Sequence, residues 1–396
     1  MKEHHKISTA SVRHGLWLAG VLIVTVALMA ARLAWLASQR QPETTAVAPV
    51  RIEPPAKPAA VPATPSRATL PEVVKMPASK PSQLPPVTPP AVAPLTPPIP
   101  TPLVVAPVTA EILKPPAPVA TDGFALIPAG RFSMGNALAA SDDGHSNELP
   151  AHAVRLAAFR MAQHEVTKAL WDEVRIWGVS HGYTDLPPGK ANSANHPVHS
   201  LDWYSLVKWC NAHSEKAGLK PCYSVGGEIY RTGSSAPDCD WSANGYRLPT
   251  EAEWEKAARG GLTDKRFPWG DTISHREANF RNEGGEPYQS GTSGDHPAYS
   301  AGAEPYTSPV GSFAANGYGL FDMAGNLAEW CWDWYGPYPA ADLANPPGAA
   351  SGTLRVYRGG SWRHNASDCR VADRYFSYPG GAYDYVGFRL ARGGTP

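Results

Sequence analysis

The sequence has no excess of charge of either sign. Its 396 residues include 35 Lys and Arg and 35 Asp and Glu, so the formal net charge at pH 7 is zero. A protein that binds DNA or RNA generally presents a clearly basic surface to the phosphates. The balanced composition therefore argues against a nucleic-acid partner.

Long periodic runs of apolar residues are scarce after the first third of the chain. That part is instead rich in Gly, Asn, Pro, Tyr and Trp, and the 13 tryptophans of the sequence indicate a substantial core. Such a domain is held by buried aromatic rings and by side chains bonded to the backbone more than by long regular elements. We therefore expect an irregular α+β fold with short helices and small antiparallel sheets.

An uncharged apolar run lies near the N-terminus, at 15–31, and basic residues precede it. Its length and flanking charge predict a transmembrane signal anchor over 15–37, with residues 1–14 in the cytoplasm. A cleaved signal peptide is the alternative, because small residues at 27–31 could form a cleavage site. Both alternatives place the remainder outside the cytoplasm. With the anchor retained, we predict a single-pass protein of the bacterial inner membrane whose C-terminal domain is in the periplasm.

Proline dominates residues 38–121, which hold more than half of the 42 prolines of the chain. Such a segment cannot bury enough apolar surface to fold, and its prolines favour an extended polyproline II conformation. At about 3.1 Å per residue, roughly 80 residues could reach on the order of 250 Å. We predict a disordered linker, which serves either as a spacer of required reach or as a plain connection.

The folded part is predicted to span 122–396. Apolar residues that alternate with turn formers over 123–135 predict a short hairpin. Three helices are also predicted from apolar spacing and capping residues: one with Leu170, Val174 and Trp177 on its apolar face and Gly178 as its end, one from Asp202 to Gly218, and one that begins with the capping box of Thr250 and Glu253.

The folded part resembles the formylglycine-generating enzymes, also called sulfatase-modifying factor domains. The resemblance implies a C-type-lectin-like fold for 122–396. It rests on motifs that follow the order of the family, at 159–167, 196–203, 245–254 (GYRLPTEAEW), 257–261, 267–270 (FPWG), 316–320, 325–326, 329–330, 358–362 (RGGSW) and 387–389 (GFR).

The best-known members of that family oxidise a cysteine of a sulfatase with copper, which two cysteine thiolates bind after the Gly-Gly-Ser motif. Here Cys369 is the only cysteine between Ser361 and Gly387. Because one thiolate cannot replace two, copper is not expected, and Cys369 would be catalytic only if the chain were an oxidase after all. Related domains use non-haem iron instead. His196 and His199 form a close pair but lack a partnering carboxylate motif, which favours a structural role.

The resemblance also implies structural calcium. Residues 322–329 follow the spacing of the family's calcium motif with Asp322 in place of its Asn; Asp322 and Glu329 would supply side-chain oxygens, and Gly325 and Leu327 would supply carbonyls. A hydrogen-bonded turn is the alternative. A second calcium site would begin at Asn279 and Phe280, although its later acidic ligand cannot be aligned.

Five cysteines in an exported chain suggest two disulfides and one spare thiol. Cys222 and Cys239 flank a loop rich in Gly and Ser, and a bridge there would stabilise the fold by roughly 3 kcal/mol in the chain-entropy model. This pair is the predicted disulfide. The sequence does not choose among Cys210, Cys331 and Cys369.

The segment 363–385 has fixed motifs on both sides and neither helix nor strand period inside. Tyrosines and adaptable polar groups of this kind are typical of binding surfaces. The segment also resembles the variable region of diversity-generating retroelement target proteins. We predict a surface that binds an unknown protein or small molecule; an ordinary irregular loop, a metal-dependent oxidase and a structural envelope module are the alternatives. The predicted contact residues are Arg363, His364, Asn365, Tyr375, Phe376, Tyr378, Tyr383, Asp384 and Tyr385.

Overall fold

The computed structural model describes residues 122–138 and 144–393. The predicted anchor and the proline-rich linker lie outside these residues. Within them, no helix combines the length and the apolar character that a membrane crossing requires. The membrane prediction therefore stays a prediction.

The three predicted helices are confirmed. α3 (Trp203–Lys216) and α4 (Glu251–Ala258) begin after the predicted caps, since the Asp202 side chain accepts from the Ser205 N–H and Thr250 forms a capping box with Glu253. α3 ends just before Gly218, whose φ of 70° suits a residue without a side chain.

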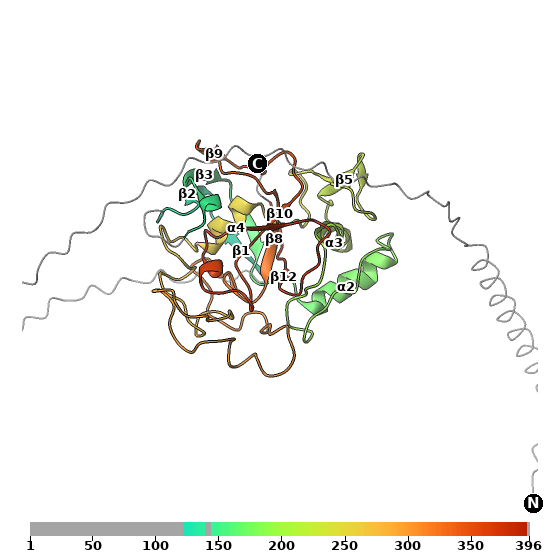
Figure 1. Ribbon diagram of the computed structural model, residues 1–396. Coiled ribbons are helices and arrows are strands. Elements are labelled where there is room, and N and C mark those ends of the chain that lie inside the picture. Colours follow the sequence, from blue (N-terminus) through green and yellow to red (C-terminus); the bar gives the residue numbers. More distant parts are fainter. Residues whose placement is uncertain (1–121, 139–143, 394–396) are drawn as a thin grey trace, which may run out of the picture. The chain divides into compact units, whose positions relative to one another are not determined.

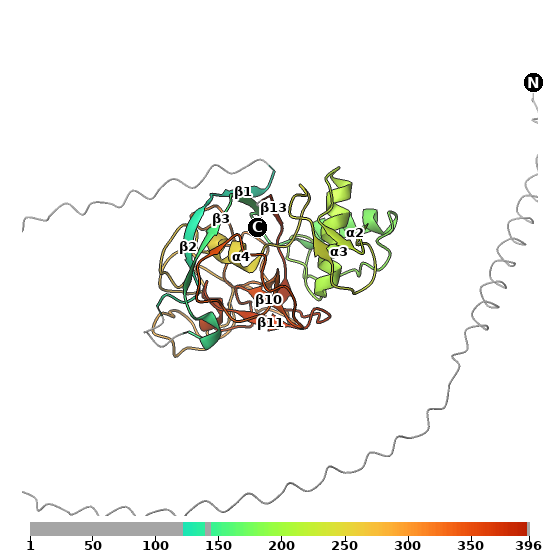
Figure 2. The ribbon, with the colours of Figure 1, turned by 90° about the horizontal axis from the view of Figure 1, so that it is seen from above.

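The first helix, α2 (Lys168–Val179), runs one residue past its predicted end. Gly178 is buried inside the last turn, where an added Cβ would lie 3.3 Å from the Cβ of Ala212 in α3. The glycine thus allows α2 and α3 to approach closely instead of ending α2. Figures 1 and 2 show these two helices side by side.

Four small sheets and two 3-10 turns complete the fold. Two sheets have the strand orders β1-β4-β13 and β2-β3-β9, with β1 (Phe124–Ile127), β4 (Phe159–Ala162), β13 (Ala391–Arg392), β2 (Gly130–Met134), β3 (His152–Leu156) and β9 (Leu343–Ala344). The others are β11-β10-β8-β12 and β6-β5-β7, with β11 (Tyr375–Ser377), β10 (Arg355–Arg358), β8 (Ala328–Trp334), β12 (Val386–Gly387), β6 (Glu228–Ile229), β5 (Tyr223–Val225) and β7 (Asp238–Cys239). The turns are η1 (Ser146–Glu148) and η2 (Ser367–Cys369).

The predicted hairpin over 123–135 is wrong. Both strands form, but β1 pairs with β4 and β2 pairs with β3, so they belong to different sheets. Pro128 cannot donate to a ladder, and Gly130 has a φ of 147°, so the short connection directs the chain away instead of folding it back. Most strand pairs are antiparallel as predicted, but β12–β8 and β3–β9 are parallel.

Buried tryptophans form the core between the helices and the central strand β8. Trp171 of α2 stacks on Trp209 of α3 with ring centroids 5.4 Å apart, and Phe388 meets both rings edge-on. Trp203 donates its indole N–H to the Cys331 carbonyl of β8, at 2.8 Å. These contacts confirm that aromatic burial, more than long regular elements, holds the domain.

The C-terminal segment is fixed at both ends by one strand. β10 and β12 lie on opposite sides of β8, in the middle of the ribbon in Figure 1. The chain between them carries η2, β11 and irregular loops. The framework motifs on either side of 363–385 are therefore neighbours in one sheet.

Candidate functional site

The structure brings most of the predicted contact residues together. Side chains that follow β10, lie in β11 or precede β12 form a group that we call the C-terminal aromatic cluster: Arg363, His364, Tyr375, Tyr383, Asp384 and Tyr385. Arg363 is exposed and the others are half-buried. The cluster therefore has both a packed base and a face open to solvent.

His364 is the centre of this cluster. Its ring stacks on Tyr375 and meets Tyr385 edge-on, with centroids 5.3 Å away in both cases. Tyr383 lies 5.2 Å from Tyr385, and the guanidinium of Arg363 lies 5.0 Å from the Tyr385 ring. The cluster thus offers aromatic faces, hydroxyls and a cation at one place, which are groups that bind diverse partners.

The charge of the cluster is carried by Arg363 and Asp384, whose nearest nitrogen and oxygen are 3.8 Å apart. Burial lowers the pKa of His364, which favours the neutral imidazole. Its Nδ1 lies 2.8 Å from the Ser361 hydroxyl oxygen. The surface therefore presents one exposed, weakly held ion pair over a neutral aromatic base.

Strand alternation separates two predicted residues from this cluster. Tyr375 of β11 faces Tyr357, whereas Phe376 turns to the opposite side and packs on Tyr335, with ring centroids 3.9 Å apart. Tyr378 is 68% exposed. Both remain accessible, but they flank the cluster and do not belong to it.

Asn365 is half-buried, and its side chain is engaged in a local turn. Its side-chain oxygen Oδ1 accepts from the Ser367 hydroxyl at 2.5 Å and from the Asp368 N–H at 3.3 Å. These bonds hold the start of η2. A polar residue in a loop is as suited to a local turn as to a ligand, and the sequence does not distinguish the two.

Cys369 is fully buried, and burial raises the pKa of its thiol well above the usual range. An added Cβ at Gly360 would lie 2.6 Å from its Sγ, so the Gly-Gly backbone packs directly on the sulfur. No other cysteine belongs to the hydrophobic cluster of the described residues that contains Cys369. In this setting the thiol is a small apolar core group.

The two predicted calcium segments lie against each other. The Asn326 N–H donates to the Asn279 carbonyl at 2.7 Å, and an added Cβ at Gly325 would lie 2.3 Å from that carbonyl oxygen. The side-chain oxygens of Asn279 (Oδ1) and Asp322 (Oδ1) are both buried without a partner. Burial raises the pKa of Asp322 to about 6. These two orphaned oxygens fit a hard cation.

Glu329 fits that role less well. Its carboxylate accepts from Arg389 Nε at 2.7 Å and from Nη2 at 2.6 Å, and the Trp254 indole N–H donates to it at 2.7 Å. The Phe280 carbonyl likewise lies 3.0 Å from His275 Nε2. Both calcium sites remain predictions, with Asp322 and Asn279 as the better-placed oxygens.

Glu165 is a functional candidate that the sequence did not single out. It accepts from the Asn326 amide at 2.7 Å and from the Leu327 N–H at 3.0 Å. Burial, with the nearby charges of Asp322 and Glu329, raises its pKa well above the usual value. No local pattern marks it, because its partners follow more than 150 residues later.

The predicted disulfide is not formed in the structure, in which Cys222 and Cys239 are free thiols. They lie on neighbouring backbone segments, since Tyr223 pairs with Cys239 between β5 and β7. The buried Asn211 side chain holds this loop by accepting from the Tyr223 N–H and donating to the Tyr223 carbonyl. These hydrogen bonds restrain the loop for which the sequence predicts a Cys222–Cys239 disulfide.

His196 and His199 each contact a hydroxyl group, and neither bonds to a carboxylate of the described residues. His196 Nδ1 lies 2.9 Å from the Thr307 hydroxyl, and His199 Nδ1 lies 3.0 Å from the Ser200 hydroxyl. Burial lowers the pKa of both imidazoles. These contacts agree with a structural role.

His145, Glu148 and Asp373 form a further cluster that the sequence did not reveal. Among the residues of 122–138 and 144–393, only they bring three possible metal-ligand atoms within 4.8 Å of one another. Both oxygens of Glu148 are already bonded by Arg370, at 2.7 and 2.8 Å. The guanidinium therefore takes the place that a cation would need.

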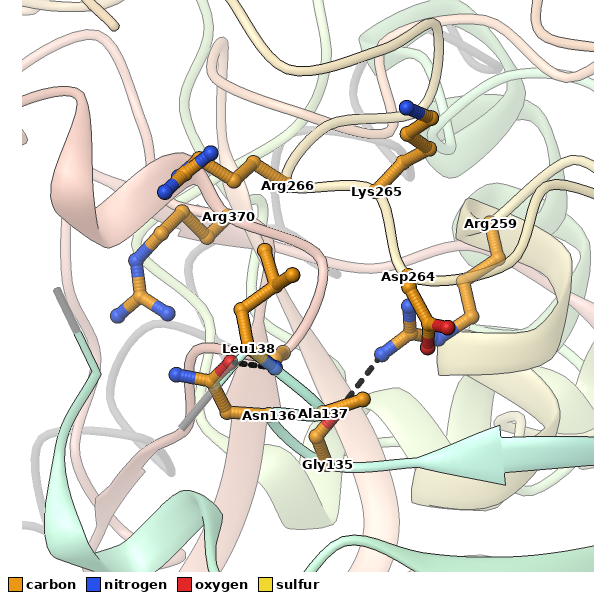
Figure 3. Close-up of a pocket in the computed structure, with 10 residues that line it drawn as sticks. Gly135, Asn136, Ala137, Leu138, Arg259, Asp264, Lys265, Arg266 and Arg370 are labelled. Carbon is orange, nitrogen blue, oxygen red and sulfur yellow. Dashed lines mark hydrogen bonds between the residues drawn. The ribbon is translucent and has the colours of Figure 1, made fainter. Parts of the chain in front are cut away.

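A small cavity nearby is lined by basic side chains (Figure 3). Arg259 donates to the Gly135 carbonyl at 2.9 Å and pairs with Glu255, and Arg370 pairs with Glu148. The cavity has a volume of about 10 Å³, room for about one water. It is a packed corner and not a ligand site.

The short helices, the four small sheets and the long C-terminal segment define an α+β domain of the C-type-lectin-like class. Residues 110–393 match the family described as the Sulfatase-modifying factor enzyme 1-like domain, and the chain belongs to this family. The resemblance inferred from the motifs is thereby confirmed.

Known relatives differ in their names. A formylglycine-generating enzyme of Streptomyces coelicolor is 32% identical over 317 residues, which cover 73% of this chain and 96% of that enzyme. A serine/threonine-protein kinase pkn1 of Chlamydia caviae is 34% identical over 286 residues, 70% of this chain but only 39% of that protein. The chain thus spans well under half of the kinase. Among solved structures, Treponema denticola variable protein 1 is similar, with a TM-score of 0.54, 32% identity, and coverage of 68% of this chain and 94% of that protein.

Proposed function

We propose that the chain is a membrane-anchored binding module of the bacterial envelope, with its C-terminal domain in the periplasm and the C-terminal aromatic cluster as its ligand surface. The observation that carries the proposal is the cluster itself. Half-exposed rings around His364 and the exposed Arg363–Asp384 pair meet on a loop whose ends are fixed by β8. A rigid frame under adaptable contact residues is typical of binding loops.

The burial of Cys369 supports binding over oxidation. A copper site of the family type needs two thiolates, and a buried thiol with a raised pKa stays protonated. Similarity to Treponema denticola variable protein 1 supports a surface whose side chains can change. A downstream near-copy of the DNA for residues 359–392, beside a reverse transcriptase gene, would identify the retroelement form of this proposal, and absence of both would exclude that form.

The binding proposal is tested with the full chain on a glycan array and on a random peptide display library. Arg363→Ala combined with Asp384→Ala should abolish the selected signals, because it removes the charged groups of the cluster. Arg131→Ala combined with Asp342→Ala is the matched control, since this is also an exposed Arg–Asp pair. Equal signals from both double variants would reject the cluster as the ligand surface.

A copper-dependent or iron-dependent oxidase acting on a thiol is the second candidate, supported by the identity to a formylglycine-generating enzyme over nearly its whole length. Incubation of the full chain with copper, oxygen and a Cys-x-Pro-x-Arg peptide would show loss of the thiol by mass spectrometry. We expect no loss. Thiol oxidation that disappears in Cys369→Ser would establish the oxidase instead.

We also propose that calcium stabilises the loops around Asp322 and Asn279. Their unpartnered buried oxygens support it, and a cation would offset the carboxylates of Asp322 and Glu165. Calcium should raise the melting temperature of the wild-type chain, and Asp322→Asn should remove that increase. An increase of the same size in Asp322→Asn would exclude this site.

A further inference from the structure

A second cavity has a volume of about 380 Å³. It lies between the end of β8, the start of α4 and the loops on either side of β9. None of the nine residues predicted to contact a ligand lines it. Its volume falls in the range of small-molecule sites.

The walls of this cavity are mostly apolar. The rings of Trp334 and Tyr338 form part of them, and Leu343 and Met134 contribute aliphatic surface. Prolines at 337, 339, 346 and 347 line the loops. Rings and prolines of this kind change shape little, so the cavity is largely preformed for a flat or apolar body.

Two buried carboxylates line the cavity, but only one of them is neutralised. Glu251 receives two hydrogen bonds from Arg374, at 2.6 and 2.8 Å, and one from the Tyr338 hydroxyl at 3.2 Å. Asp333 is 6% exposed and has no ion pair among the described residues. Its Oδ2 accepts from the Glu251 N–H at 2.7 Å. Its Oδ1 accepts no hydrogen bond from the residues that the structure describes.

Asp333 is held by the first N–H of α4, but this bond does not supply an ion-pair partner for its carboxylate. Burial, with the charge of Glu251, raises the pKa of Asp333 to about 7. An isolated carboxylate in an apolar site is unfavourable unless a cation or a donor satisfies it. Arg374 is committed to Glu251, and Arg355, which also acts on Asp333 electrostatically, donates to the Trp332 carbonyl and stacks on tryptophan rings. No described cation therefore forms an ion pair with Asp333, and a ligand cation could supply one.

We propose that this cavity binds a small organic cation, in which an apolar or aromatic body carries a primary ammonium or guanidinium group that pairs with Asp333. The apolar walls would contact the apolar part of the ligand, and the Asp333 carboxylate would pair with its cationic group. The source is either a free amine or a lysine or arginine side chain of a peptide. This inference does not rest on the proposed function of the aromatic cluster.

Binding is coupled to the ionisation of Asp333. At pH 5 the carboxyl is largely protonated, so the cation gains no ion pair, and affinity rises toward about pH 8 while the ligand keeps its charge. The neutral isostere of the same ligand has no such dependence. The pH profile therefore separates charge pairing from mere filling of an apolar cavity.

The test uses calorimetric titration of the full chain with 2-phenylethylammonium, with neutral 2-phenylethanol, and with a short peptide that carries one central lysine. We expect at least one cationic probe to bind and the alcohol to bind about tenfold more weakly or not at all. Binding of the peptide alone would assign a protein source, and binding of the amine would assign a free ligand. Failure of both cationic probes at pH 8 would overturn the proposal.

Two variants locate the site. Asp333→Asn keeps the shape and an acceptor for the Glu251 N–H, and it should weaken cation binding about tenfold or more. Asp342→Asn, on an exposed acid that does not line the cavity, should leave binding unchanged. Equal affinity of Asp333→Asn and wild type would overturn the proposal. If Asp333→Asn does not fold, the affinity of the wild-type chain for the cationic probe is compared at pH 5 and pH 8. An affinity that does not rise with pH would also overturn the proposal.

Discussion

The buried arginines in and around the C-terminal segment and the arginine on its surface are held in different ways. Arg358, Arg370, Arg374 and Arg389 are buried, and each pairs with a buried glutamate from a distant part of the chain. Arg363 is exposed, and its pair with Asp384 is loose. The buried pairs fix the frame, while the exposed pair can exchange its partner for a ligand.

This difference follows from desolvation. Removing one member of a buried pair leaves the other charge unpaired in an apolar setting, whereas an exposed charge returns to water. The same residue type therefore serves stability in one place and recognition in the other. Substitutions in the two regions should differ by several kcal/mol in their effect on the free energy of unfolding.

The largest effect is expected for Arg389→Met. It leaves Glu329 unpaired beside Glu165 and Asp322, and it should lower the free energy of unfolding by about 3–5 kcal/mol. Urea denaturation measures it. Arg131→Met, in an exposed pair, is the control and should change stability by about 0.5 kcal/mol or less. Similar losses in both variants would remove the distinction between frame and surface.

A smaller loss is expected for Gly360→Ala. Gly360 has a φ of 67°, and an added Cβ would lie 2.6 Å from Cys369 Sγ and 2.9 Å from the Asp368 carbonyl oxygen. Strain and overpacking together should lower stability by about 2 kcal/mol. Gly380→Ala in the same segment is the matched control, because nothing lies within 4 Å of its added Cβ. A neutral Gly360→Ala would show that the Gly-Gly turn adjusts freely.

The pair of His145 with Asp373 predicts a dependence on pH. The hydrogen bond to Asp373 raises the pKa of His145 above its ordinary 6.5, with Glu148 adding to the rise and burial and Arg370 opposing it. A raised histidine pKa gives stability that is present below about pH 6.5 and is lost as the pH rises through the folded-state value. The melting temperature of wild type should therefore exceed that of His145→Gln at about pH 6, and the two should converge by about pH 8.5. A difference that stays constant with pH would show that the contact acts without charge.

The smallest effect is expected for Tyr378→Ser. Its side chain is 68% exposed, so stability should change by no more than about 0.5 kcal/mol. Thermal denaturation is the measurement. A loss comparable to that of Gly360→Ala would place Tyr378 in the frame and not on the surface.

Local signals in the sequence were sufficient for the helices. Asp202 and Thr250 bond to backbone groups a few residues away, so their roles can be recognised without knowledge of the fold. The helix ends were harder to predict, because Gly178 serves the packing of α2 on α3 and does not end α2. Its contact with Ala212 belongs to the packing of two helices, which the sequence does not display.

Long-range pairs explain what the sequence did not show. The pair of Arg370 and Glu148 joins residues 222 positions apart, and Asp333 becomes unusual only because Arg374 is taken by Glu251. The contact surface was predicted by composition, but composition could not show that the Asn365 side chain bonds to its own loop at the start of η2. The direction of a side chain depends on the local backbone conformation, which the sequence motifs do not specify.

The two edges of the first sheet have a practical consequence. β1 opens the described chain, β13 closes it, and both flank β4, so they are separated by two strand spacings, about 10 Å. Because both strands run antiparallel to β4, residues 122 and 393 lie at opposite ends of the sheet, and a glycine-serine peptide of about ten residues could join them. New ends could then be opened between Gly226 and Gly227, which are exposed in the turn between β5 and β6. Such a circular permutant would keep the sheet around β4 and would show that the fold does not depend on where the polypeptide starts.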